Sequence, residues 1–150
     1  MHDQVIVLNS RVAFEGTDNA NQKYQFDFTN WERGMYKVEL SYVGETNDLN
    51  ADKTCSIYTN LGSTLVYSAG AETASQTSTY LGTLKPRNVA SGAKSTYLSC
   101  DHNDNAPICL QTPRSNVINI QMRDGNNAVY TDSVGDELAN YILTLRFTKV

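Results

Sequence analysis

Histidine, cysteine and proline are scarce in this chain of 150 residues, which contains two His, three Cys and three Pro. Structural zinc sites take four Cys or His ligands, often in C-x-x-C pairs, and the chain has no such pair. An EF-hand that began at Asp101 would need Gly and Glu where Ala106 and Thr112 stand. Phosphate-binding glycine loops and the G-x-S-x-G elbow of hydrolases are also missing. The sequence therefore predicts a protein that is not an enzyme, with no catalytic residue, no metal and no cofactor.

Long apolar runs and clustered basic residues are missing as well. The apolar run near the start, from Val5 to Leu8, is far shorter than a signal-peptide core or the ~20 residues of a membrane span. Twelve basic and sixteen acidic residues give a net charge of −4, and the basic residues are scattered. No Asn-x-Ser/Thr sequon occurs, and an odd cysteine count disfavours a secreted protein. We expect no membrane insertion, no nucleic-acid partner and synthesis in the cytoplasm.

What the chain does contain favours β-structure. Hydrophobic residues make up 40% and charged residues 19%, a composition that excludes a disordered chain. Asn, Thr and Ser are abundant and Tyr occurs nine times, so residues that favour strands and turns outnumber the strong helix formers. The length suits a single core, and no linker or internal repeat divides it. We therefore expect one all-β domain over residues 1–150.

Apolar and polar residues alternate with a period of two in four segments, as they do in half-buried strands. These segments are 24–28, 36–42, 118–123 and 141–148. Less regular strand candidates are 5–9, 55–59, 64–68, 79–84, 96–100 and 108–111. Gly, Asn and Asp separate them at the intervals typical of a sandwich or barrel. The pattern predicts a β-sandwich of about 8–10 antiparallel strands, with a single helical turn at 30–33.

The aromatic residues divide into core and surface candidates. Four tyrosines fall on the buried phase of a strand and are predicted to lie in the core: Tyr24, Tyr36, Tyr42 and Tyr141. The aromatic candidates for a surface that stacks on sugars or anchors a protein contact are Trp31, Tyr67, Tyr80 and Tyr130. Trp31 is the strongest anchor candidate, and its alternative role is to plug the end of its own sandwich.

Contacts with other chains are expected in loops, because end loops carry the binding residues of a rigid β-scaffold. The loops expected to make contacts are 31–33, 69–78, 85–88 and 126–137. With Trp31, the candidate interface residues are Arg33, Lys85, Arg87 and Tyr130.

Two of the three cysteines flank a turn-rich segment. Cys100 and Cys109 lie on either side of DHNDNAPI, so a hairpin would bring them together as a disulfide. Two buried thiols are the alternative. The sequence leaves both open.

The order of the segments resembles a known family. VIVLNS, YQFDFTNWERGMYKVELSYVGE, NAPICLQTPRSNVINIQMRDG and ELANYILTLRF look like the small single jelly-roll capsid proteins of large icosahedral nucleocytoplasmic DNA viruses. The resemblance implies a single jelly-roll β-sandwich and a virion structural protein, either the penton at the vertices or a minor capsid protein. It also implies that the partners are other copies of the chain, in a pentamer, and other capsid proteins. Such a protein is assembled into the virion in the host cytoplasm.

Two other functions suit an all-β sandwich, because one fold hosts many functions. A carbohydrate-binding module would present an exposed, coplanar set of aromatic side chains and bind sugar as a monomer. A small cupin-like enzyme would need convergent His and carboxylate ligands inside a barrel. A capsid subunit needs neither and is expected to make large contacts with other chains.

Overall fold

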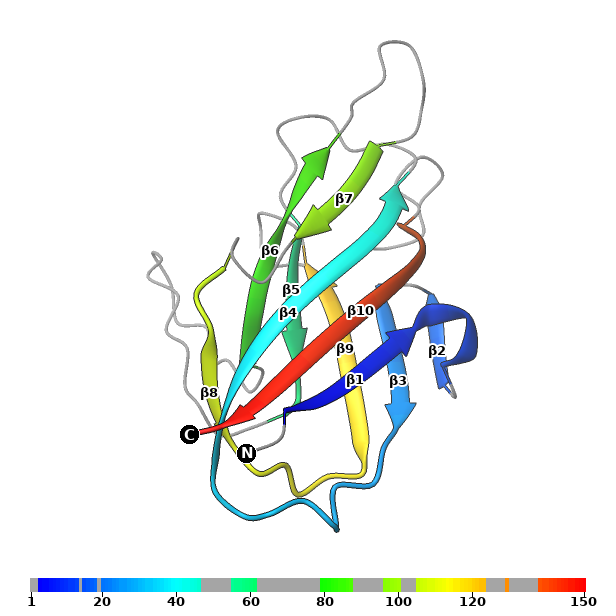
Figure 1. The fold of residues 1–150 in the computed structure, drawn as a ribbon. Helices are drawn as coiled ribbons and strands as arrows, with labels where there is room; N and C mark the ends of the chain where they lie inside the picture. The colour runs from blue at the N-terminus through cyan, green and yellow to red at the C-terminus, as the bar shows by residue number, and fades with distance from the viewer. Residues whose placement is uncertain are drawn as a thin grey trace, which may run out of the picture.

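A computed structural model describes residues 3–13, 15–18, 20–46, 55–61, 79–87, 96–100, 105–123, 129 and 138–150. Within these ranges the chain forms ten strands and one short 3₁₀ turn, with no α-helix (Figure 1). The elements are β1 (Gln4–Asn9), η1 (Ser10–Val12), β2 (Glu15–Asp18), β3 (Asn21–Gln25), β4 (Met35–Thr46), β5 (Cys55–Thr59), β6 (Thr79–Arg87), β7 (Thr96–Cys100), β8 (Ile108–Gln111), β9 (Val117–Arg123) and β10 (Leu138–Lys149). The prediction of an all-β protein is confirmed.

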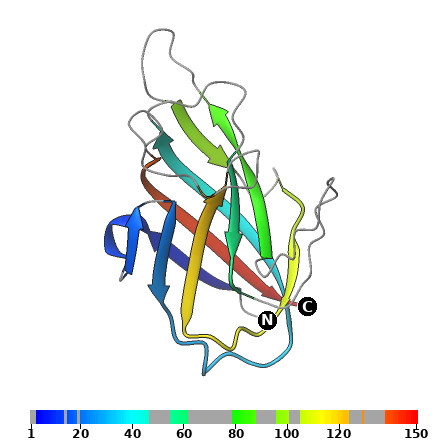
Figure 2. The same cartoon turned by 180° about the vertical axis from the view of Figure 1, so that it is seen from behind.

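The strands form two antiparallel layers. One layer has the order β1, β10, β4, β7, and the other has the order β3, β9, β5, β6, with β2 added outside β3 (Figures 1 and 2). β6 joins the layers, because its residues 79–84 pair with β5 and its residues 85–87 pair with β7. β8 pairs with β4 on the same side as β7.

The pairing is nested along the chain. β1 pairs with β10, β3 with β9, β4 with β7, and β5 with β6, so that strands early in the sequence meet strands late in it. A long hairpin rolled up on itself gives this order, which is the double Greek key of a jelly roll. The chain is therefore a single jelly-roll sandwich, as predicted.

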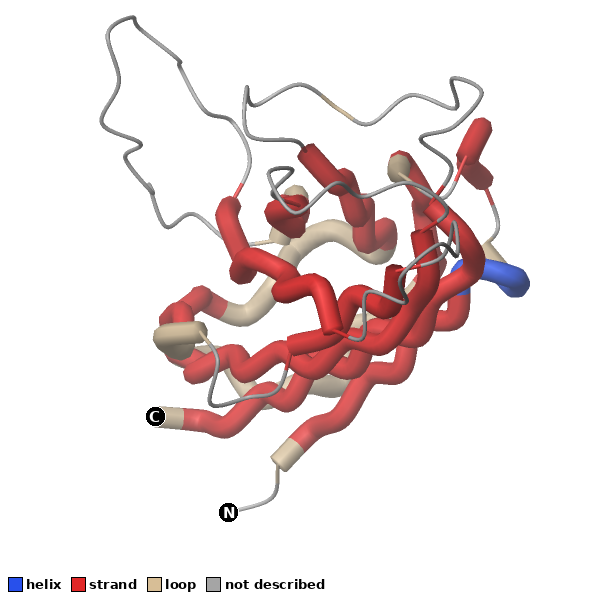
Figure 3. The backbone as a smooth tube through the Cα atoms, turned by 90° about the horizontal axis from the view of Figure 1, so that it is seen from above, coloured by secondary structure: helices blue, strands red, loops and turns tan. Residues whose placement is uncertain are grey.

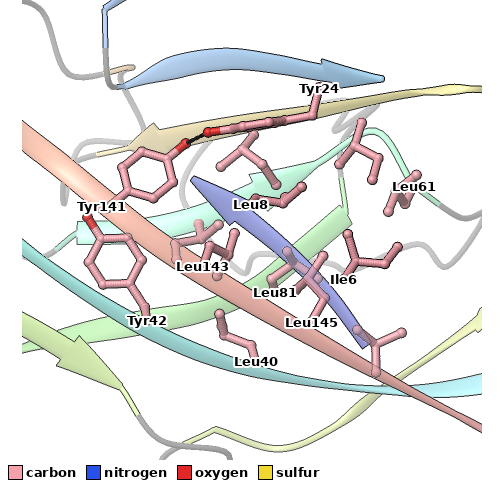
Figure 4. Packing of buried hydrophobic residues seen from close by; sticks show 14 of the residues in the cluster. Ile6, Leu8, Tyr24, Leu40, Tyr42, Leu61, Leu81, Tyr141, Leu143 and Leu145 are labelled. Atoms are coloured by element: carbon pink, nitrogen blue, oxygen red, sulfur yellow. Dashed lines mark hydrogen bonds between the residues drawn. The ribbon is translucent and has the colours of Figure 1, made fainter. Parts of the chain in front are cut away.

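Alternation along the strands decides which side chains fill the space between the layers. In β9, Ile118, Ile120 and Met122 are fully buried while the residues between them are partly exposed. In β10, Leu143 and Leu145 are buried in the same way (Figure 4). Each such side chain contributes ~1.5–3 kcal/mol by leaving water, so the core rests on the period of two that the sequence displays.

A group of three buried tyrosines lies in the core beside Gly44. The Tyr24 hydroxyl donates to the Tyr141 hydroxyl at 3.0 Å, and the rings of Tyr42 and Tyr141 stack with centroids 5.3 Å apart (Figure 4). The Tyr42 hydroxyl donates to Sδ of Met122 at 3.8 Å. A Cβ at Gly44 would lie 2.8 Å from the Tyr42 hydroxyl, so only glycine fits there. The core placement predicted for these tyrosines and for Tyr36 is confirmed.

Several local predictions were wrong or incomplete. β3 starts at Asn21 and ends at Gln25, so Phe26 and Phe28 lie in the following loop. The helical turn expected at 30–33 does not form. The turn lies over 28–31 instead: the Trp31 N–H donates to the Phe28 carbonyl at 3.0 Å, and the Asp27 carboxylate accepts the Thr29 N–H at 2.8 Å at its start. β2 was not predicted, and the strand candidate at 64–68 lies outside the described residues.

Candidate functional site

Two loops at one end of the sandwich are hydrogen-bonded to each other. The loop that joins β3 to β4 meets the segment that joins β8 to β9, and Thr112 is the main link between them. The Gly34 N–H donates to Thr112 Oγ1 at 2.9 Å, and the Thr112 N–H donates to the Gly34 carbonyl at 2.9 Å. Further along, the Phe26 N–H donates to the Asn116 carbonyl at 2.9 Å. These bonds hold both loops in one conformation relative to the sheets.

Between the same loops lies a cleft of about 710 Å³. Its lining combines apolar side chains with two guanidinium groups; the residues include Phe28, Trp31, Arg33, Met35, Pro113 and Arg114. Arg33 and Arg114 are both exposed. A cleft lined by apolar side chains and two exposed cations can accept a group that is partly apolar and carries negative charge.

Trp31 is held by aromatic rings from inside the sandwich. Its ring centroid lies 5.0 Å from that of Phe28, 5.0 Å from that of Phe147 and 5.4 Å from that of Tyr36. Phe26 adds a fourth ring at 5.8 Å. Trp31 therefore plugs the end of its own sandwich, which is the alternative role considered for it. It also lines the cleft, as Arg33 does.

The structure does not gather the five candidate interface residues. Trp31 and Arg33 lie at the end where the chain passes from β3 to β4. Lys85 and Arg87 were expected in a loop but lie in β6, where that strand turns to pair with β7. This part of β6 is at the opposite end of the sandwich, near its arrowhead in Figure 1. Tyr130 lies outside the described residues, as do 69–78 and most of 126–137.

Cys100 and Cys109, the candidates for a disulfide, lie on two strands that both pair with β4 but at different positions along it. Cys100 of β7 lies opposite Tyr42, and Cys109 of β8 lies opposite Lys37. Five residues of extended strand separate these positions, ~17 Å at the usual rise per residue. A disulfide needs Cα atoms within about 4.4–6.8 Å, so this strand register does not bring the pair together. Cys109 is exposed rather than buried, because it lies on the outer face of β8.

Exposed apolar side chains gather on the outer face of the layer that contains β1. The outer apolar patch consists of Val5, Val7, Val43 and Ile142, which are 56%, 60%, 53% and 43% exposed. Ile142 of β10 pairs with Val43 of β4 on one side and with Asn9 of β1 on the other. The sequence signal for this patch is an apolar residue at a strand position that faces solvent. It is clearest in the run from Val5 to Leu8, where every residue is apolar, but no surface was predicted from it.

Charged side chains occupy the remaining part of the same face. Arg146 Nη2 lies 3.0 Å from Glu39 Oε2, and Lys37 Nζ lies 3.3 Å from Glu39 Oε1. Asp3 Oδ2 lies 3.5 Å from Arg146 Nε. Val5 lies opposite Arg146, so the charged network and the outer apolar patch adjoin each other on this face.

Among the described residues, the pKa is shifted for two buried tyrosines and for Asp27. Burial raises the pKa of Tyr24, partly offset by its bond to Tyr141, and burial followed by the bond to Tyr24 raises the pKa of Tyr141. The pKa of Asp27 is lowered by hydrogen bonds from the Thr29 hydroxyl and N–H. Asp27 is part of the turn that precedes the cleft, so its charge supports the local chain conformation.

Within the described ranges, no three His, Cys, Asp or Glu side chains lie close enough together to hold a metal ion. No described helix is long and apolar enough to cross a membrane. No family model and no curated protein matches the chain.

Proposed function

We propose that the chain is a structural subunit of an icosahedral DNA-virus capsid, as the penton or as a minor capsid protein, and that it works by association with other chains. The observation that carries the proposal is the nested pairing of β1 with β10, β3 with β9, β4 with β7 and β5 with β6. This single jelly roll takes up most of the described chain and agrees with the family that the sequence segments resemble.

The hydrogen-bonded end loops suit the role of a capsid subunit. A subunit in a closed ring contacts its neighbours through two different surfaces, and these surfaces must keep their shape for the ring to close. Thr112 links the two loops through Gly34, and four aromatic rings surround Trp31, so both loops are anchored to the sandwich. Rigid loops lose little conformational entropy on association, which favours specific contacts.

Counting the protein in purified virus particles tests the proposal. Five copies at each of twelve vertices give about sixty copies per particle, whereas a minor capsid protein is expected in another fixed number. Absence of the protein from purified particles would contradict the capsid role.

Charge reversal at the end loops gives a second test. Arg33→Glu is expected to reduce incorporation into particles, because it places a negative charge at the rim of the cleft. The matched control is Lys23→Glu, an exposed cation in β3 on the other layer, which is expected to incorporate normally. Equal incorporation of the two variants would remove the end loops from the assembly contacts.

The cleft supports a carbohydrate-binding module as the second candidate function. Its volume of about 710 Å³ and its two arginines fit a sugar that carries a carboxylate or sulfate. Titration of the isolated monomer with neutral and acidic oligosaccharides would decide this. Saturable binding that Arg33→Ala and Arg114→Ala each weaken, together with absence from particles, would favour the carbohydrate function.

A further inference from the structure

The outer edge of β1 has no strand partner within the described part of the chain. β1 pairs with β10 alone, and the order of paired strands ends at β1 on one side and at β2 on the other. In the view from above, the strand that follows the N-terminus lies at the border of the sandwich (Figure 3). Every second residue of an edge strand directs its N–H and C=O groups away from the sheet, where they can bind another strand.

β2, at the other end of the strand order, has the features that protect an edge. Its sequence EGTD carries two acidic residues and a glycine, and its pairing with β3 shifts register between Gly16 and Asp18. Glu15 also forms an ion pair with Lys23 at 3.0 Å. Charge and an irregular register both discourage a further strand from pairing there.

β1 has none of these features. Its sequence QVIVLN contains no charged residue, no Pro and no Gly, and it pairs with β10 in unbroken register from Gln4 to Asn9. Val5 and Val7 project to the outer face, where Val5 lies opposite Arg146 and Val7 lies opposite Thr144. Ile142 of β10 and Val43 of β4 lie farther along the same face. A regular, uncharged and apolar edge of this kind favours pairing with another strand.

We propose that a second copy of this chain pairs with it through β1, antiparallel and across a two-fold axis at Val7. Residues directly opposite each other in an antiparallel pair lie on the same face of the sheet. The outer faces of the two copies therefore form one continuous surface only if a residue at the axis lies opposite the same residue of the other copy. If the axis lay midway between two successive residues, the outer face of one copy would adjoin the inner face of the other. Centred on Val7, the pairing sets Val7 against Val7, Ile6 against Leu8, and Val5 against Asn9 of the other copy.

Charge favours this register. Asp3 immediately precedes β1 and Arg11 lies in the 3₁₀ turn that follows it, so the Val7-centred pairing sets the end of β1 that carries Asp3 beside the end of the other copy that carries Arg11. Asp3 also lies 3.5 Å from Arg146 Nε of its own chain. A pairing centred on Ile6 would instead set Asp3 against Asn9 and place the amide of Gln4 against the buried Leu8. The two-fold axis at Val7 thus sets ends of opposite charge beside each other and keeps the apolar side chains of Ile6, Val7 and Leu8 together.

This pairing goes beyond the proposed capsid role and does not depend on it. An isologous contact joins two isolated copies, whereas a ring of five closes through heterologous contacts elsewhere on the surface. Association in purified solution therefore tests the pairing, and counting copies in particles tests the function.

Cysteine cross-linking tests the register. In Val7→Cys the two introduced residues face each other with Cα atoms ~4.5–5.5 Å apart, which fits a disulfide. Mild oxidation is expected to give a covalent dimer. Val5→Cys is the matched control, because Val5 is similarly exposed yet lies ~14 Å along the strand from its own counterpart.

A mixture of Val5→Cys and Asn9→Cys is expected to give a mixed dimer, and the unmodified protein shows the background from the native cysteines. Cross-linking of Val5→Cys to itself as fast as Val7→Cys, or no cross-linking of Val7→Cys above background, would overturn the Val7-centred pairing.

The oligomeric state gives an independent test. Sedimentation of the unmodified protein up to about 100 μM is expected to show a monomer–dimer equilibrium. Val7→Lys sets two like charges against each other at the axis and is expected to raise the dimer Kd on the order of tenfold or more. Val43→Lys changes an equally exposed residue of a central strand and is expected to keep the dimer.

Thermal unfolding of Val7→Lys at a concentration where both proteins are monomers checks that the variant is folded. A monomer at every concentration for the unmodified protein, or a dimer that folded Val7→Lys keeps unchanged, would show that β1 does not pair with a second copy.

Discussion

The two outer faces of the sandwich are built by the same alternation but carry different side chains. On the layer of β3, β9, β5 and β6, polar and aromatic side chains bind one another across the strands. The Arg123 guanidinium lies 4.4 Å from the ring centre of Tyr58 and donates to Gln121 Oε1 at 3.0 Å. Ser56 and Thr83 hydroxyls lie 3.0 Å apart. On the layer of β1, β10 and β4, four apolar residues instead form the outer apolar patch.

This difference indicates where the molecule associates. The first face is built largely from polar side chains, so covering that face would cost desolvation with little apolar gain. The outer apolar patch offers the opposite balance, since each Å² of apolar surface removed from water contributes ~25 cal/mol. It is also continuous with the unprotected edge of β1. One fold therefore presents one polar face and one face on which a charged network adjoins an apolar patch.

The largest expected effect distinguishes the buried side of β10 from its outer side. Leu143→Ala is expected to lower the free energy of unfolding by ~2–5 kcal/mol, because it removes buried apolar volume and leaves a cavity. The neighbouring Thr144→Ala on the outer face is the control and is expected to cost less than ~0.5 kcal/mol. Denaturant titration measures both, and a cost below ~1 kcal/mol for Leu143→Ala would contradict the assignment of faces.

The next largest effect on stability is expected for the buried tyrosines, which lie between the two layers rather than on an outer face. Tyr141→Phe is expected to cost ~0.5–1.5 kcal/mol, because the Tyr24 hydroxyl loses its partner. The pH profile of unfolding provides a second measurement. The folded state raises the pKa of Tyr24 and Tyr141 above the ordinary value of 10.0, so above that pH it holds more protons than the unfolded chain does.

The stability that these hydroxyls contribute is therefore complete below pH ~10 and is lost as pH rises further. Tyr141→Phe is expected to make this alkaline loss shallower. The same alkaline slope in both proteins would mean that Tyr141 does not titrate with unfolding.

A smaller effect is expected on the polar outer face. Arg123→Ala removes the cation that lies over Tyr58 and the bond to Gln121, and is expected to cost ~0.5–1 kcal/mol. Chemical denaturation of Arg123→Ala beside Lys23→Ala measures it, since Lys23 forms only an exposed ion pair on the same layer. Equal costs for the two would show that the polar face is not held by the contact with Tyr58.

The smallest effect on stability is expected in the outer apolar patch. Val43→Thr keeps a β-branched side chain in a central strand and is expected to change the free energy of unfolding by no more than ~0.5 kcal/mol. Binding of an apolar dye is expected to fall at the same time, because the patch becomes smaller. A cost above ~1.5 kcal/mol would mean that Val43 is covered within the folded chain.

Much of the fold was predictable because the period of two is a local property. The alternation through Ile118 and Leu143 identified two core strands before any pairing was known. β2 was missed because EGTD has no apolar alternation to detect, and it forms only by pairing with β3. The loop role of Phe28 was missed because the turn at Asp27 ends the strand while the alternation of Tyr24, Phe26 and Phe28 continues.

The candidate sites were less predictable. Trp31 and Arg33 were singled out, but the cleft also needs Pro113 and Arg114, which are about eighty residues away in sequence and reach it through Thr112. Lys85 and Arg87 were grouped with them on polarity and an expected loop position, but they lie in β6, whose pairing with β7 carries them to the other end of the sandwich.

The sequence by itself determined which side of each strand faces the core, because successive side chains of an extended chain point to opposite faces whatever the partner strand is. It also determined the uncharged, regular character of β1. Only the tertiary structure decided that β1 lies at an edge beside β10, because strand pairing depends on contacts between distant segments rather than on local preference. That pairing placed Val5 opposite Arg146, Val7 opposite Thr144 and Ile142 opposite Val43, and so made one outer face from residues that are scattered along the chain.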